Sequence, residues 1–147
     1  MADFADKRDS RCLPKIVKQV KKNLNINGLT IKQLAADTGY SSGEALKYCE
    51  ENDIDAYIPN FGQYKFEREG FIYNEELDQY ECQRGNKAML PFKNTRERVD
   101  GYQYKQYSSS TNVCKNCPLH EECCGKKSKF KEINHSIHKE YYDNMHL

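Results

Sequence analysis

The chain has 147 residues, of which 31% are charged and 37% hydrophobic, with a formal net charge of +1. Four prolines and eight glycines are too few for a disordered or collagen-like chain. No apolar run approaches the roughly 20 residues that span a bilayer, and the N-terminus has no signal-peptide core. We therefore expect one ordinary domain, or a small domain with an insertion, that lies in the cytoplasm and has no membrane partner.

An amphipathic helix is predicted over residues 12–24. Its apolar side chains recur at the spacing of one helix face: Leu13, Ile16, Val17, Val20 and Leu24. Lysines occupy the other face, and Pro14 is tolerated because it falls in the first turn. Asn27 and Gly28 end the helix.

A strand, a second helix and a second strand are predicted next. Residues 29–36 form the first strand. Ser41 and Glu44 have the spacing of a capping box, which starts a helix that runs to about residue 52 and buries Ala45, Leu46 and Cys49. The second strand covers residues 54–59 and stops at proline. Helix, strand, helix and strand in this order are typical of a parallel α/β unit.

The character of the sequence changes at Asn60. Short aromatic segments, punctuated by glycine and proline, predict antiparallel strands at residues 71–73, 80–82, 88–90 and 102–104. A polar turn over 108–111 leads into a cysteine cluster, and a strand follows near residues 129–133. A final helix begins at about residue 137 and meets Leu147 without a stop signal, so we expect it to be truncated.

The cysteine cluster predicts a structural zinc site. Cys114 and Cys117 form a C-x2-C pair, which a tight turn brings to one tetrahedral ion, and Cys82 and Cys123 complete four thiolates. Four thiolates leave zinc no open position, so the site would stabilise a fold. An iron–sulfur cluster and plain reduced thiols are the alternatives, Cys124 is a spare thiol, and His120 is a substitute ligand.

Asp37 lies between an apolar run and a glycine turn. An aspartate before Thr-Gly is most often a turn or cap residue. Residues 36–48 with 51–59, however, closely resemble the second-aspartate region of bacterial insertion-sequence transposases of the DDE class: A-D-x-G-Y-x-S, a helix, a gap and an isoleucine-rich strand ending in proline. The resemblance continues through Tyr80-x-Cys82, Cys114-x2-Cys117-Pro118-Leu119 and Cys123, which are similar to the cysteine-bearing insertion of one branch.

The resemblance implies an RNase H-like core in which three acids bind two divalent cations, Mg²⁺ or Mn²⁺, for cleavage and strand transfer of transposon-end DNA. Asp37 matches the middle acid. The first aspartate of the family would lie upstream of this chain and its last glutamate downstream of Leu147. The chain is therefore expected to be an internal fragment with one catalytic acid, inactive alone, and self-association is a further expectation.

The expected organisation is α/β. Residues 1–60 form a partial RNase H-like core, residues 61–134 an inserted zinc-ribbon-like antiparallel β subdomain, and residues 135–147 the start of a truncated core helix. The alternative function is a non-catalytic zinc-ribbon-like module that binds DNA or protein. Cys12 and Cys49 are expected to be buried small hydrophobes, and His135 and His138 surface histidines at a helix start.

Overall fold

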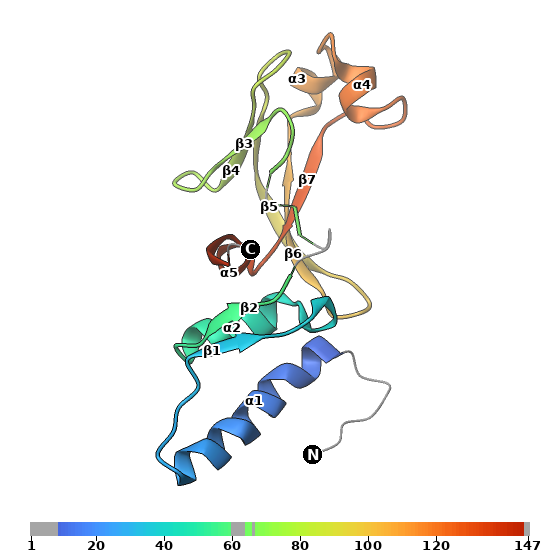
Figure 1. Ribbon diagram of the computed structural model, residues 1–147. Coiled ribbons are helices and arrows are strands. Elements are labelled where there is room, and N and C mark those ends of the chain that lie inside the picture. Colours follow the sequence, from blue (N-terminus) through green and yellow to red (C-terminus); the bar gives the residue numbers. More distant parts are fainter. Residues whose placement is uncertain (1–8, 60–63, 66, 146–147) are drawn as a thin grey trace. The chain divides into compact units, whose positions relative to one another are not determined.

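The structure is a computed structural model that describes residues 9–59, 64, 65 and 67–145. The chain divides into two compact units: Met1–Tyr64 with His138–Leu147, and Lys65–Ile137. The predicted mixed α/β class is confirmed, with a small parallel sheet in the first unit and a five-stranded antiparallel sheet in the second (Figure 1).

The first unit begins with helix α1 (Asp9–Ile26), which is longer than predicted at both ends. Gly28 has φ +72, the left-handed conformation that favours glycine after a helix, so the predicted stop signal is confirmed. Strand β1 (Gln33–Ala35) is only three residues long because its hydrogen-bonded partner in the described chain, strand β2 (Asp55–Tyr57), is equally short.

The two short strands flank a 3-10 turn, η1 (Thr38–Tyr40), and helix α2 (Gly43–Glu51). They run parallel, with Gln33 opposite Asp55 and Ala35 opposite Tyr57. The predicted capping box is wrong, because the N-cap of α2 is Ser42, whose Oγ accepts a hydrogen bond from the Ala45 amide at 3.0 Å. Glu44 is thereby only two positions from the cap and cannot reach back as the box requires.

The core of the first unit is formed by α1, α2, the strand ends and helix α5 (Lys139–Asn144). Its buried residues are Leu13, Val17, Ala45, Leu46, Cys49, Ile54, Ile58, Tyr64, Tyr142 and Met145. Tyr64 and Tyr142 stack with ring centroids 4.5 Å apart, and they join the two chain segments that flank the second unit. Cys12 and Cys49 are both buried, as predicted.

The second unit is a sheet in the order β3-β4-β5-β6-β7, with every neighbouring pair antiparallel (Figure 1). Its strands are β3 (Phe71–Asn74), β4 (Gln79–Cys82), β5 (Met89–Glu97), β6 (Gln103–Ser108) and β7 (Glu132–Ser136). The first four include most or all of the residues predicted as strands. A bulge at Phe92–Asn94 shifts the register between β5 and β6, and bulges increase strand twist.

Two short helices carry the cysteines between β6 and β7: α3 (Thr111–Lys115) and α4 (His120–Cys124). Neither was predicted, since helices of five residues are too short to show a periodic pattern. The last strand lies three residues later than expected, so His135 is within β7 and is buried. The prediction that His135 is a surface residue is wrong.

Candidate functional site

Asp37 follows the carboxyl end of β1 and caps η1. Its Oδ1 accepts a hydrogen bond from the Gly39 amide at 2.9 Å, which fixes the carboxylate to its own turn. The side chain is exposed, and Oδ2 makes no hydrogen bond or ion pair with any residue that the structure describes. The interpretation of Asp37 as a cap residue is therefore confirmed. Its second carboxylate oxygen, Oδ2, stays available to a ligand from solvent.

The strands around Asp37 form a β1–α2–β2 unit with parallel strands. Ala36 extends the pairing, because its amide donates to the Tyr57 carbonyl at 3.2 Å. The loop after β1 and the end of β2 consequently lie at the same edge of the small sheet. This edge is where ligands bind in open α/β folds, since the loops after the carboxyl ends of parallel strands converge there.

Five cysteines and His120 line one small cavity in the second unit, of about 30 Å³. The thiols come from the end of β4, from α3 and the residue after its cap, and from α4: Cys82, Cys114, Cys117, Cys123 and Cys124. All four predicted zinc ligands are thus brought to one place. The cavity is large enough for a single water-sized sphere.

Several thiols in this cavity have polar neighbours within the protein. Cys114 Sγ lies 2.9 Å from Ser109 Oγ, and Cys82 Sγ donates to the Arg84 carbonyl at 3.1 Å. Burial, together with the neighbouring Cys123 and Cys114 thiols, raises the pKa of Cys124 to about 11. Across the described residues, no three His, Cys, Asp or Glu side chains are arranged to hold a metal ion, at Asp37 or at the cysteines.

The turn after Cys82 packs closely against the C-x2-C pair. Gly85 has φ +51, and a Cβ at this position would lie 2.4 Å from Cys117 Sγ. The backbone turn after Cys82 is therefore in close contact with the second sulfur of the C-x2-C pair. His120 Nδ1 is already bonded to the Cys114 carbonyl at 2.7 Å.

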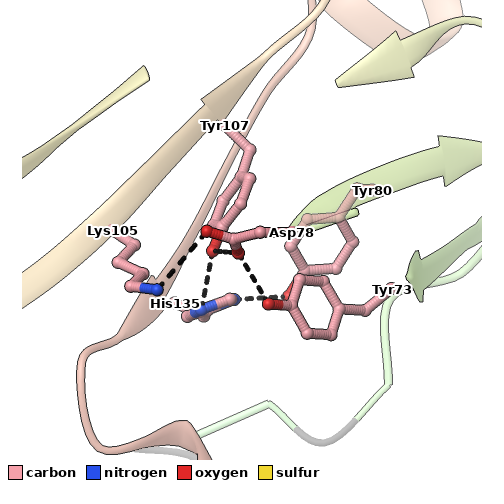
Figure 2. Close-up of polar contacts among 6 residues, drawn as sticks. All are labelled: Tyr73, Asp78, Tyr80, Lys105, Tyr107 and His135. Atoms are coloured by element: carbon pink, nitrogen blue, oxygen red, sulfur yellow. Dashed lines mark hydrogen bonds and ion pairs between the residues drawn. The ribbon is translucent and has the colours of Figure 1, made fainter. Parts of the chain in front are cut away.

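A third cluster, missed by the sequence reading, surrounds Asp78 in the turn between β3 and β4 (Figure 2). The hydroxyls of Tyr107 and Tyr73 donate to Asp78 Oδ1 at 2.6 and 2.7 Å, and Lys105 Nζ lies 3.5 Å from Oδ2. Burial alone would raise the pKa of Asp78, but the two tyrosine hydrogen bonds and Lys105 outweigh it and lower this pKa.

His135 extends the cluster across the sheet. Its Nε2 lies 3.1 Å from the Tyr107 hydroxyl, and its Nδ1 lies 2.9 Å from the Tyr80 hydroxyl. Because Tyr107 gives its proton to Asp78, its oxygen is free to accept from Nε2–H. The hydroxyls of Tyr107 and Tyr80 thus contact both ring nitrogens of His135.

The Asp78 cluster is suited to holding strands together. Burial and the hydrogen bond to Asp78 raise the pKa of Tyr73 to about 12, and the same two causes raise the pKa of Tyr107 further, so both phenols keep their protons. The polar groups of the tyrosines, Asp78 and His135 each contact another residue of the cluster. The sequence signal that could have found it is the presence of a tyrosine in each of two adjacent predicted strands, Tyr73 and Tyr80. These two residues lie opposite each other on β3 and β4.

Comparisons with protein-family models, with curated proteins and with solved structures found no match to this chain. Among the residues that the structure describes, no helix has the length and apolar character needed to cross a membrane.

Proposed function

We propose that this chain is part of a DDE-class transposase and that Asp37 is the middle acid of its metal-binding triad. The observation that carries the proposal is the position of Asp37, just after the end of β1. This strand pairs in parallel with β2, and α2 connects the two strands. This is the position that the resemblance implies for the second acid of an RNase H-like core.

The local contacts of Asp37 suit a metal ligand. The Gly39 amide orients the carboxylate through Oδ1 and leaves Oδ2 for a cation. Mg²⁺ prefers such oxygen ligands and retains water in its remaining positions. Two ions between three acids would activate the attacking oxygen and stabilise the leaving oxygen of a DNA phosphodiester. Asp37 alone cannot hold two ions, so the chain by itself is expected to be inactive.

Exposed apolar side chains on α1 support a larger core. Ile16 and Val20 are 37% and 43% exposed, although they lie beside buried Leu13 and Val17 on the apolar face of the helix. A two-stranded sheet is too narrow to cover this face. Further strands of an RNase H-like sheet would bury it.

The cysteine cavity is proposed to hold one structural Zn²⁺ through Cys82, Cys114, Cys117 and Cys123. What supports this is that all four thiols line one small cavity, closed by the turn at Gly85. A zinc-ribbon-like role for the second unit follows, since a small sheet with a modest core gains folding free energy from a metal. Iron–sulfur ligation remains the alternative, distinguished by absorption near 400 nm.

A non-catalytic binding module is the second candidate function. It is favoured by the exposed position of Asp37 and by the finding that no described group of three acids or other ligands converges on a metal position. The two candidates differ in one respect: only a transposase requires Asp37 for chemistry.

The test extends the reading frame through its genomic flanks, which should encode an upstream strand ending in aspartate and a downstream helix bearing glutamate. In the extended protein, Asp37→Asn should lower Mn²⁺-dependent cleavage of transposon-end DNA by more than about 100-fold, because the two-ion site would lose one of its three carboxylate ligands. Asp55→Asn, at an exposed position on β2, is the matched control. Flanks without these acids, or equal activity of both variants, would refute the transposase assignment.

A further inference from the structure

Positive charge is concentrated on α1. Of the 23 basic residues in the chain, five lie within residues 10–26, and of the 22 acidic residues none does. The remainder of the chain therefore carries a net charge of −4, against +1 for the whole. Such segregation of charge creates a local field that attracts polyanions, even though the protein as a whole is almost neutral.

The basic residues are ordered on the helix surface. At 3.6 residues per turn, Lys15, Lys18 and Lys22 fall within about 60° of arc, and Arg11 falls in the same arc. Leu13 and Val17 point the opposite way, into the core of the first unit. We call Lys15, Lys18 and Lys22 the lysine stripe.

The lysine stripe is available for binding. All three side chains are exposed, and none has a hydrogen bond or ion pair with another residue that the structure describes. Lys21, beside the stripe, differs because its Nζ donates to Asn52 Oδ1 at 3.3 Å. Lys18 and Lys22 also line an open hollow of about 540 Å³ with Lys21, Asn25 and Ile26.

We propose that the lysine stripe is a binding surface for the phosphate backbone of duplex DNA. The choice of DNA as the polyanion rests on the proposed transposase function. Successive stripe residues rise along α1 by about 4.5 and 6 Å, a spacing at which flexible lysines reach neighbouring phosphates of one strand. Neutralising phosphates releases condensed counterions, so binding should be strongly salt-dependent and independent of base sequence.

A membrane surface is the less suitable partner for this helix. Amphipathic helices bind bilayers by inserting their apolar face between lipid headgroups. On α1 that face includes Leu13 and Val17, which are buried in the protein core. The exposed apolar residues Ile16 and Val20 lie beside these buried side chains and away from the lysine stripe, so the stripe itself offers charge without an apolar surface to insert, which fits a phosphate backbone better than a bilayer.

The experiment measures binding of the full chain to a fluorescently labelled duplex by anisotropy over a range of salt concentrations. The triple variant K15Q/K18Q/K22Q should bind at least about 10-fold more weakly at low salt, and the slope of log K against log salt should fall by about 2–3. The control K126Q/K127Q/K129Q removes the same charge from exposed lysines of the second unit. It should change affinity less than 2-fold, roughly the limit of a resolvable effect.

Unchanged binding by the stripe variant, or equal losses in both triple variants, would overturn the lysine stripe as a site. Stripe-dependent binding to anionic vesicles that exceeds binding to DNA would overturn the choice of partner. The variant K15R/K18R/K22R should retain binding, and circular dichroism should show unchanged helix content. Because the stripe is tested by DNA binding and the catalytic proposal by DNA cleavage, failure of the stripe is distinguishable from failure of the catalytic proposal.

Discussion

Asp78 shows at the scale of one residue how the second unit is held together. Its backbone is in the left-handed conformation, φ +47, which is uncommon for a residue with a side chain. The strain is tolerated because the carboxylate accepts hydrogen bonds from the hydroxyls of Tyr73 and Tyr107 and lies beside Lys105. Through Tyr107 it is also linked to buried His135, so one turn residue connects β3, β6 and β7.

Replacing Asp78 should therefore destabilise the second unit. We expect Asp78→Asn to lower the free energy of unfolding by about 1–3 kcal/mol at pH 7, since charge-assisted hydrogen bonds are lost. The pKa of Asp78 is lowered by folding, so its contribution is full above the unfolded value and disappears as the pH falls through the folded value.

Urea denaturation of the wild type and Asp78→Asn at pH 7 and near pH 3 measures this effect. The difference between the two proteins should be large at neutral pH and should shrink in acid. Glu76→Gln, a neighbouring exposed carboxylate, is the control and should change neither value. A difference between wild type and Asp78→Asn that does not depend on pH would contradict the role assigned to the ionised carboxylate.

At the scale of elements, the start of α2 depends on which of two adjacent serines caps the helix. Ser42 Oγ accepts from the Ala45 amide, whereas Ser41 Oγ is buried without a hydrogen-bond partner among the described residues. Gly43 follows, and a Cβ there would lie 2.4 Å from the Cβ of His138. The helix start is thus determined jointly by a cap and by a close contact with the segment that precedes α5.

The two serines provide a matched pair of substitutions. Ser42→Ala should lower the free energy of unfolding by about 1 kcal/mol, because an amide of the first turn loses its acceptor. Ser41→Ala should leave stability unchanged or raise it slightly, since an unpaired buried hydroxyl is removed. Thermal denaturation compares them directly, and a larger loss for Ser41→Ala would mean that the cap is at Ser41 after all.

At the scale of the whole molecule, the two units should respond differently to metal. If Zn²⁺ occupies the cysteine cavity, the purified chain should contain one zinc per molecule, and chelation should reduce hydrogen-exchange protection in residues 67–137 more than in α1 and α2. The reason is that the second unit has only a small core of six buried residues beside the cavity.

Cys114→Ser should reproduce the effect of chelation, whereas Cys49→Ser, in the core of the first unit, should leave the zinc content unchanged. Metal analysis and hydrogen exchange are the measurements. A chain that binds no zinc under reducing conditions, or one in which chelation lowers protection equally in both units, would refute the structural zinc site.

Local pattern was sufficient for the elements. The apolar spacing of Leu13, Val17 and Leu24 predicts α1, and glycine, proline and aromatic punctuation predicts most strands, because these signals act between residues close in sequence. The position of Asp37 between a strand and a helix is predicted by the same kind of local signal. The placement of β7 was wrong by three residues, since Glu132–Ser136 contains a single apolar residue, Ile133, and therefore no alternation that marks the strand.

By itself, the sequence determined the order of the strands and of the longer helices, the buried state of Cys12 and Cys49, and the residue types available for metal and phosphate. Only the tertiary structure decided which of them meet. Tyr80 and His135 are 55 positions apart, and Cys82 reaches the cavity of Cys114 and Cys123 through strand pairing. Such contacts depend on sheet order and register, which arise from long-range pairing and burial that no local pattern encodes.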